Sequence, residues 1–190
     1  MSTRTLGLIG SAAGGVEQIR TSLVEPALAR GWRVAVTLTP TAGSWLEDTG
    51  ERERIEQVAG LPCRTAPRMP SAPSPHPQID CYLVCPASAN TVAKLALGIS
   101  DNQALTTVCE AIGAHDVPIV VFPRVNAAHT RQPAWNAHIE ALRGAGVQLL
   151  IGDEYWPLHE PRSSAEKELP WERILDVVGR VVKPESPESA

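Results

Sequence analysis

Residues 79–91 read IDCYLVCPASANT and join an apolar run to a polar turn. The run from Ile79 to Cys85 predicts a buried β-strand that ends at Pro86. The residues from Ala87 to Leu97 predict a helix that follows directly. The turn between strand and helix carries three polar side chains: Ser88, Asn90 and Thr91. Ligands of open α/β sheets bind at such turns, so this segment predicts both a fold class and the position of a site.

The same alternation of strand and helix extends to both sides of this segment. Short apolar runs predict four further strands, at Thr5–Gly10, Arg33–Leu38, Pro118–Phe122 and Val147–Ile151. Helices are expected at Val16–Leu28, from Ala42, at Asn102–Ile112, at Pro133–Arg143 and from Pro170 to Val182. The pattern predicts an α/β protein with a doubly wound, mostly parallel sheet, in a Rossmann-like three-layer sandwich. We expect a single domain over residues 1–183 and a disordered tail over 184–190.

A proline-rich segment lies between the second and third expected strands. Regular helix and central strand are excluded over residues 66–78 by Pro67, Pro70, Pro73, Pro75 and Pro77. The segment is too short to link two domains. We therefore expect an ordered surface loop that lies near the mouth of a site.

Composition excludes several classes of protein. The chain has 190 residues, of which 43% are hydrophobic and 20% charged, so it can form a core. A net charge of −4 argues against nucleic-acid binding. No apolar run is long enough to cross a bilayer, and no signal-peptide core is visible, so we expect a cytoplasmic protein without a membrane partner. Without a C-x-x-C pair we expect no metal site, and thiols at Cys63, Cys81, Cys85 and Cys109.

Two further turns follow expected strands at the same edge of the sheet. The small-residue turn Gly10–Gly15 would expose backbone N–H groups to an anion, and Ser11 would add a hydroxyl donor. The alternative is a tight turn without a ligand. A second cluster contains Thr39, Thr41 and Ser44, which fit either a helix N-cap or a phosphate site.

The third turn carries a family resemblance. PASANT at residues 86–91, with GISDN at 98–102 and TTVC at 106–109, resembles the flavoprotein family of homo-oligomeric flavin-containing cysteine decarboxylases. The resemblance covers residues 5–151. The family includes phosphopantothenoylcysteine decarboxylases, peptidyl-cysteine decarboxylases of lantibiotic biosynthesis and, more distantly, flavin prenyltransferases. It implies an FMN cofactor held between the subunits of a homotrimer, with dodecamers in some members.

The resemblance also implies roles for individual residues. The implied FMN-binding positions are Gly10, Ser11 and Ala12 in the first turn, Thr39 and Ser44 in the second, Ser88, Ala89, Asn90 and Thr91 in the third, and Asp101 beside Asn102 at the subunit contact. Asn90 resembles the family's catalytic asparagine, which holds the substrate carboxylate. An amide suits that task because it donates a hydrogen bond without a titrating charge. The alternative role of Asn90 is a helix cap.

Two parts of the chain depart from the family pattern. The substrate-recognition segment P-x-M-N-x-x-M-W reads PRVNAAHT at residues 123–130, which leaves Arg124, Asn126 and His129 as the candidate substrate-binding residues. Arg124 and His129 either meet an anionic substrate or face solvent. The family's catalytic histidine lies on a short helix before the PASANT strand, whereas here His76 lies in the proline-rich segment. His76 is either the proton-transferring base or an ordinary loop histidine.

A third departure lies in the C-terminal segment. Members of the coenzyme A pathway carry a cysteine and a Gly-rich lid there, and residues 152–171 have neither, which argues against that role. The segment carries Tyr155, Trp156, His159 and Trp171 instead. These rings either cover a flavin or peptide, or anchor the C-terminal helix.

The resemblance therefore implies an FMN-dependent decarboxylase. The expected reaction is oxidative decarboxylation of a cysteine-like small-molecule thiol acid, or of a peptide's C-terminal cysteine, to an enethiol. Three alternatives remain open: a flavin prenyltransferase, a carrier or regulatory flavoprotein without decarboxylase activity, and an assembly module with an empty cleft.

Overall fold

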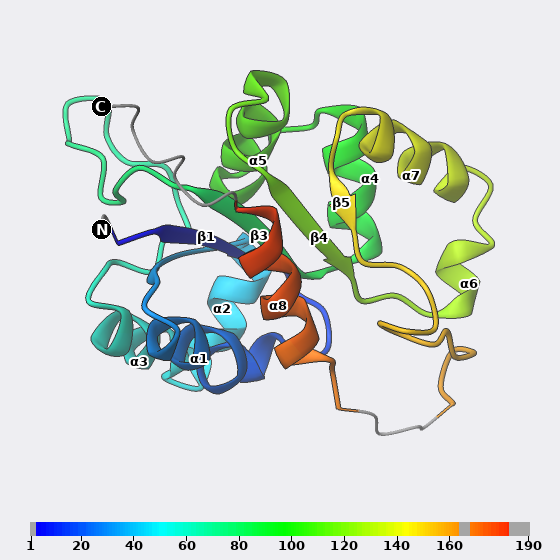
Figure 1. The fold of residues 1–190 in the computed structure, drawn as a ribbon, viewed down its shortest axis with the longest axis horizontal. Helices are drawn as coiled ribbons and strands as arrows, with labels where there is room; N and C mark the ends of the chain where they lie inside the picture. The colour runs from blue at the N-terminus through cyan, green and yellow to red at the C-terminus, as the bar shows by residue number, and fades with distance from the viewer. Residues whose placement is uncertain (1–2, 164–167, 183–190) are drawn as a thin grey trace, which may run out of the picture.

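A computed structural model describes residues 3–163 and 168–182. Its centre is one sheet of parallel strands in the order β2-β1-β3-β4-β5 (Figure 1). The strands are β1 (Thr5–Gly10), β2 (Arg33–Leu38), β3 (Cys81–Ala87), β4 (Ile119–Pro123) and β5 (Gln148–Leu149). All five lie within or close to the runs expected from the sequence. The expected tail at 184–190 lies outside the described residues.

Helices cover both faces of the sheet, which confirms the expected doubly wound three-layer architecture (Figure 1). One face packs against α1 (Glu25–Ala29), α2 (Pro40–Asp48), α3 (Glu51–Ala59) and α8 (Trp171–Val181). The other packs against α4 (Ala89–Leu97), α5 (Gln103–Ala114) and α7 (Trp135–Gly144). A short helix, α6 (Ala127–Thr130), follows β4.

Alternation along each strand divides the core in two. In β3, Leu83 and Cys85 pack into one hydrophobic cluster, whereas Val84 packs into the other. In β4, Phe122 and Val121 divide in the same way. Successive side chains of a strand point to opposite faces, so a strand covered on both faces must be apolar throughout. This explains why the central strands read as continuous apolar runs.

Several boundaries differ from those expected. The helix expected over residues 16–28 is divided into a 3-10 turn (Val16–Gln18), a π-helical turn (Arg20–Val24) and α1. Pro26 lies in the first turn of α1, where its missing N–H does no harm. Strand β3 continues through Pro86 to Ala87 instead of ending at the proline.

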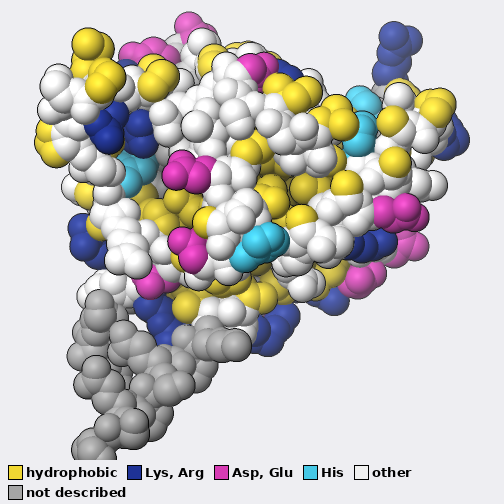
Figure 2. All heavy atoms as spheres, turned by 90° about the horizontal axis from the view of Figure 1, so that it is seen from above, with side chains coloured by type: hydrophobic (Ala, Val, Ile, Leu, Met, Phe, Trp, Pro, Cys, Tyr) yellow, Lys and Arg dark blue, Asp and Glu magenta, His cyan; other side chains and the backbone are white. Residues whose placement is uncertain are grey.

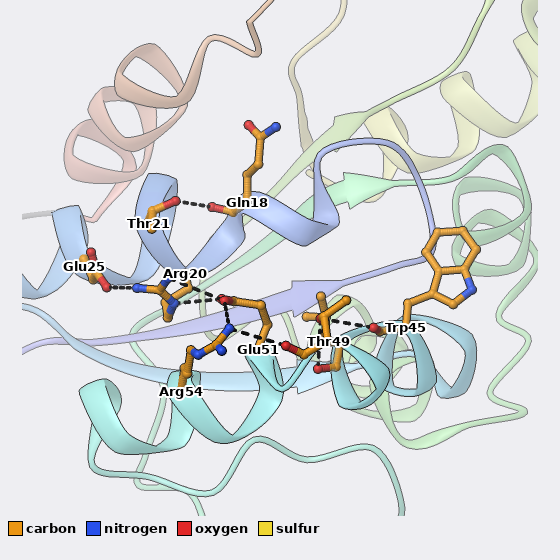
Figure 3. A network of polar contacts seen from close by, with 9 residues as sticks. Gln18, Arg20, Thr21, Glu25, Trp45, Thr49, Glu51 and Arg54 are labelled. Carbon is orange, nitrogen blue, oxygen red and sulfur yellow. Dashed lines mark hydrogen bonds and ion pairs between the residues drawn. The ribbon is translucent and has the colours of Figure 1, made fainter.

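Ion pairs hold the divided helix against α3. The Arg20 guanidinium bonds Glu51 at the start of α3, with Nε 2.7 Å from Oε2, and also pairs with Glu25 (Figure 3). Glu51 in turn accepts from Arg54 at 2.6 Å. These contacts lower the pKa of the Glu51 carboxyl, chiefly through the hydrogen bond from Arg20.

The proline-rich segment forms neither helix nor strand, as expected, and it leads from Arg64, which pairs with the end of β2, back to the beginning of β1. Asp80, just after it, is fixed to the beginning of β1, because its backbone N–H donates to Thr5 and its carboxylate accepts from Thr5.

The cysteines pack as hydrophobic side chains. Cys63, Cys81 and Cys85 are buried free thiols, and Cys109 is half-buried and also free. Burial raises the pKa of the Cys63 and Cys81 thiols to about 12, so they are protonated at neutral pH. Within the described residues, no helix has the length and apolar character needed to span a membrane, and no group of three or more potential metal-ligating side chains occurs.

Candidate functional site

A cleft of about 670 Å³ opens at the carboxyl ends of the strands. The order of the sheet reverses between β1 and β3, which is the point where open α/β sheets bind ligands. The turns after β1, β2, β3 and β4 all contribute to the walls. Of the predicted site residues, the cleft is lined by Ser11, Ala12, Thr39, Ser88, Asn90, Thr91, Asp101, Arg124, Asn126 and His129.

Ser11 joins the first turn to the third. Its buried hydroxyl donates to the Pro86 carbonyl at 2.8 Å and accepts the backbone N–H of Ser88 at 2.8 Å. The single hydroxyl proton is therefore already used inside the protein. This corrects the expectation that Ser11 donates a hydrogen bond to an anion, because its side chain fixes two turns relative to one another.

The third turn begins α4 at the cleft. Ser88 is the N-cap, and its Oγ accepts the Thr91 N–H at 3.2 Å and lies 3.0 Å from the Thr91 hydroxyl. Asn90 is exposed in the first turn of α4, and it lines the cleft. The cap role that was the alternative for Asn90 therefore belongs to Ser88. The amide of Asn90 faces the open space at the positive end of the helix dipole.

The second turn contributes Thr39 at the start of α2. Thr39 occupies the N-cap position without a side-chain cap bond, and the residue is buried. Thr39 lines the cleft. Ser44 lies one turn further along α2, where its hydroxyl bonds the Pro40 carbonyl at 3.1 Å. The geometry does not bring Ser44 to the wall of the cleft.

An internal ion pair also lines the cleft. Lys94 pairs with Asp101, whose carboxylate also accepts from Asn102 at 3.0 Å. The hydrogen bond from Lys94 lowers the pKa of Asp101. Lys94 was missed by sequence reasoning, although its position four residues after Asn90 places both on the same face of α4.

The segment after β4 forms a reciprocal cap. The Asn126 side chain accepts the His129 N–H at 3.1 Å, and the His129 ring accepts the Asn126 N–H at 3.4 Å. Because Nδ1 accepts in this bond, the neutral ring carries its proton on Nε2. The two candidate substrate-binding residues thus hold each other in place while they line the cleft.

Arg124 lies against the C-terminal segment. Its guanidinium carbon is 3.7 Å from the centre of the Trp156 indole ring, and Trp156 makes an edge contact with His159. Burial lowers the pKa of the Arg124 guanidinium, which nevertheless remains charged. In this segment Trp156 contacts Arg124, while buried Trp171 begins α8 and packs against the core, as expected for the alternative in which the rings anchor the C-terminal helix. No motif around Trp156 pointed to this contact.

Three further predicted residues are absent from the walls of this cleft. Gly10 ends β1 and Ala89 begins α4, both just behind the lining residues. His76 is placed elsewhere: its Nε2 lies 2.8 Å from the Pro62 carbonyl in the proline-rich segment. Burial there lowers the pKa of His76. Within one chain, His76 therefore does not line this cleft, and its expected role as the base stays a prediction.

The sheet order and the cleft at its reversal define an α/β protein of the Rossmann-like, flavodoxin type. The Flavoprotein family model matches residues 4–183, and the chain belongs to the Flavoprotein family.

Curated relatives match parts of the chain. It is 34% identical over 110 residues to the coenzyme A biosynthesis bifunctional protein CoaBC of Thermococcus kodakarensis, covering 58% of this chain and 24% of that protein. It is 34% identical over 71 residues to phosphopantothenoylcysteine decarboxylase of Oryza sativa, covering 37% and 31%. The chain thus spans about a quarter of the length of the CoaBC relative.

Solved structures share the fold. The FMN-dependent cysteine decarboxylase TvaF of thioviridamide biosynthesis superposes with a TM-score of 0.67 at 24% identity, over 95% of this chain and 99% of that one. MrsD from Bacillus sp. HIL-Y85/54728 gives 0.68 at 19% identity, over 95% and 97%. The peptidyl-cysteine decarboxylase EpiD gives 0.62 at 22% identity, over 96% and 100%.

Proposed function

We propose that this chain binds FMN in the cleft and catalyses the oxidative decarboxylation of a cysteine-like thiol acid or of a peptide's C-terminal cysteine. The observation that carries the proposal is the convergence of three polar turns, after β1, β2 and β3, on one cleft in a chain of the Flavoprotein family. The similarity of the chain to CoaBC, TvaF and EpiD supports the same chemistry by analogy.

The residues present fit this cofactor. A volume of about 670 Å³ lies within the range of cofactor and ligand pockets, about 300–1,000 Å³. Two nine-residue helices, α2 and α4, begin at the cleft and direct positive dipole ends toward a phosphate. The Thr39 hydroxyl lacks an internal cap bond, and Ser88 and Thr91 offer two further hydroxyls. We assign FMN binding to these residues and to the backbone of the first turn at Ser11 and Ala12, with Gly10, Ala89 and Ser44 behind them.

When bound, FMN supplies a two-electron acceptor for oxidation of the carbon that bears sulfur, and molecular oxygen serves as the external oxidant. Asn90 orients the substrate carboxylate by donating from its amide. Asn126 and His129, which follow β4, contact the rest of the substrate. The exposed position of Asn90 at the start of α4 allows it to meet a ligand without rearrangement of the helix.

We also propose that the protein assembles as a homotrimer or dodecamer. Large apolar side chains remain exposed at the end of α4, including Leu97 at 62% and Ile99 at 40%. Figure 2 shows hydrophobic side chains exposed across the middle of one face of the molecule. Burial of such surface between copies would be favourable. Light scattering coupled to size exclusion measures the assembly directly.

The placement of His76 favours one second candidate, a carrier or regulatory flavoprotein that binds FMN without decarboxylation. The experiment that separates the two has two steps. Denaturation should release a yellow chromophore with the mass of FMN. Incubation of the FMN-loaded protein with cysteine-terminated peptides should then give products that have lost carbon dioxide and two hydrogens. A yellow protein without product supports the carrier, and a colourless protein that refuses added FMN refutes both.

A further inference from the structure

Arg124 is held by packing and not by a carboxylate. Its guanidinium carbon lies 3.7 Å from the centre of the Trp156 ring, and an added Cβ on Gly14 in the first turn would meet the guanidinium at 3.8 Å. Its Nε is buried and has no hydrogen-bond partner. No ion pair of Arg124 occurs among residues 3–163 and 168–182. Arg124 also lines the cleft.

The charges of the cleft leave this cation unbalanced. Lys94 and Asp101 also line the cleft, but they pair with each other. The carboxylate of Glu17 raises the pKa of Arg124 from a distance and bonds the Gly15 N–H instead, at 3.0 Å. A half-buried arginine without an acidic partner is costly unless a ligand completes it. The cleft therefore has one fixed positive charge available to an anion.

The chemistry of decarboxylation assigns that charge to a particular part of the substrate. The carboxylate that leaves loses its negative charge as carbon dioxide forms, so a cation paired with it would stabilise the ground state more than the transition state. The neutral amide of Asn90 avoids this penalty. A cation in the same cleft is better matched to an anionic group that keeps its charge throughout the reaction.

We propose that Arg124 recognises a second anionic group of the substrate, a carboxylate or phosphate that is not lost, and that Trp156 is the positioning residue that directs Arg124 into the cleft. This inference rests on the proposed function for the identity of the reaction. If Arg124 has this role, the preferred substrate is a thiol acid with at least two negative charges. Arg124 forms charge-assisted, paired hydrogen bonds with such groups.

A binding experiment tests the inference independently of turnover. Calorimetric titration of the FMN-loaded protein compares mercaptosuccinate, which carries a thiol and two carboxylates, with 3-mercaptopropionate, which carries one carboxylate. We expect about tenfold tighter binding of mercaptosuccinate, the usual scale of one hydrogen-bonded charge. Arg124→Gln should remove the difference. Equal binding of both probes by the unaltered protein, or an unchanged preference in Arg124→Gln, overturns the inference.

Arg131→Gln is the matched control. Arg131 is exposed and pairs with Glu160, outside the cleft, so this change removes the same charge nearby without touching the site. The preference for mercaptosuccinate should survive it. If Arg124→Gln and Arg131→Gln lose the preference for mercaptosuccinate equally, the effect comes from the general electrostatic field, and recognition by Arg124 is refuted.

Substrate pairs distinguish the source of the anion and separate the two proposals. One pair is a peptide ending in Glu-Cys and the same peptide ending in Gln-Cys; the other is an N-acylcysteine with and without a phosphate on the acyl chain. The pair with the larger Arg124-dependent difference in kcat/KM identifies the source. Decarboxylation of all four at equal rates retains the proposed function and refutes the role of Arg124. No decarboxylation of any refutes the proposed function, and the titration still decides the role of Arg124.

Trp156 provides a test of positioning. Trp156→Phe keeps an aromatic face beneath the guanidinium, whereas Trp156→Leu removes it. We expect Trp156→Leu to reduce the preference for mercaptosuccinate to less than about threefold and Trp156→Phe to restore most of it. A purely structural role would lower the melting temperature without changing the preference between the probes.

Discussion

The Ser11 hydroxyl lies 2.8 Å from both the Pro86 carbonyl oxygen and the Ser88 backbone nitrogen, and so joins the turns after β1 and β3. The two turns are far apart in sequence and meet where the sheet order reverses. A hydroxyl is the smallest side chain that can donate to one and accept from the other. The geometry of the cleft depends on this link.

Replacement of Ser11 by alanine should lower both stability and FMN affinity. The change leaves the half-buried Ser88 N–H without a partner, whereas the Pro86 carbonyl keeps its bond from the Ser11 backbone N–H, and the loss costs about 1–3 kcal/mol. Chemical denaturation and flavin fluorescence titration measure the two effects. Thr21→Ala, which removes an exposed local bond to Gln18, serves as the control and should change neither. Unchanged FMN affinity in a folded Ser11→Ala protein would contradict the importance of the link.

Replacement of Asn90 by aspartate should abolish decarboxylation while the fold and the bound flavin remain. The added carboxylate repels the substrate carboxylate, and Asn90 is exposed, so the core is not disturbed. Mass spectrometry of cysteine-terminated peptides provides the measurement. Asn136→Asp, at an exposed position on α7, adds the same charge elsewhere and should retain activity. A normal rate in Asn90→Asp removes Asn90 from the mechanism.

Gly15 supports the first turn at a point where an added side chain would have to displace Leu169. Its φ is +98°, and an added Cβ would lie 2.3 Å from Leu169 Cδ1. Gly15→Ala should cost more than about 2 kcal/mol, since it combines left-handed backbone strain with a clash. Gly31→Ala isolates the strain, because φ is +84° there and no atom lies within 4 Å. Equal losses of unfolding free energy would show that the contact with Leu169 is unimportant.

His76 should be dispensable for turnover, because its ring lies in the proline-rich segment and bonds Pro62. His76→Gln, which keeps a donor near the Nε2 position, should retain decarboxylation within about twofold. Loss of turnover in a folded, yellow variant would show that the segment reaches the cleft of another copy in the assembly.

His76 also predicts a pH effect on stability. Burial lowers its pKa in the folded state below the ordinary value of 6.5, so the unfolded chain binds the proton more readily. Stability therefore decreases as pH falls below about 6.5. The unfolding free energy of His76→Gln should decrease less between pH 7 and 5 than that of the unaltered protein. Parallel pH profiles would contradict the burial of this ring.

The Arg20–Glu51 contact predicts a second pH effect (Figure 3). The pKa of Glu51 is lowered in the folded state, so its contribution is present above the ordinary value of 4.5 and is lost as pH falls through the folded pKa. Glu51→Gln should lower the melting temperature at pH 7, and the difference should vanish in acid. Glu53→Gln, on the same turn of α3, is the control because Glu53 contacts only Gln57 among the bonds of the described residues. If the melting temperature of Glu51→Gln remains lower than that of the unaltered protein in acid, the effect comes from packing and not from the ion pair.

Local patterns in the sequence determined the order of strands and helices, because the periods of two and 3.6 residues reflect burial of neighbouring side chains. The apolar runs around Leu83 and Val121 and the turn at residues 86–91 located the sheet and its ligand edge. The same strand-to-helix pattern predicted the small-residue turn after β1 and the hydroxyl of Thr39 at this edge of the sheet.

Tertiary structure alone decided how individual side chains are used. Arg124 contacts Trp156, and the Ser11 hydroxyl donates to the Pro86 carbonyl. His76 bonds the Pro62 carbonyl and does not line the cleft of its own chain. Each of these contacts joins residues that are far apart in the chain. Sequence periodicity carries no information about such pairs, because they depend on where packed helices and loops bring each backbone in space.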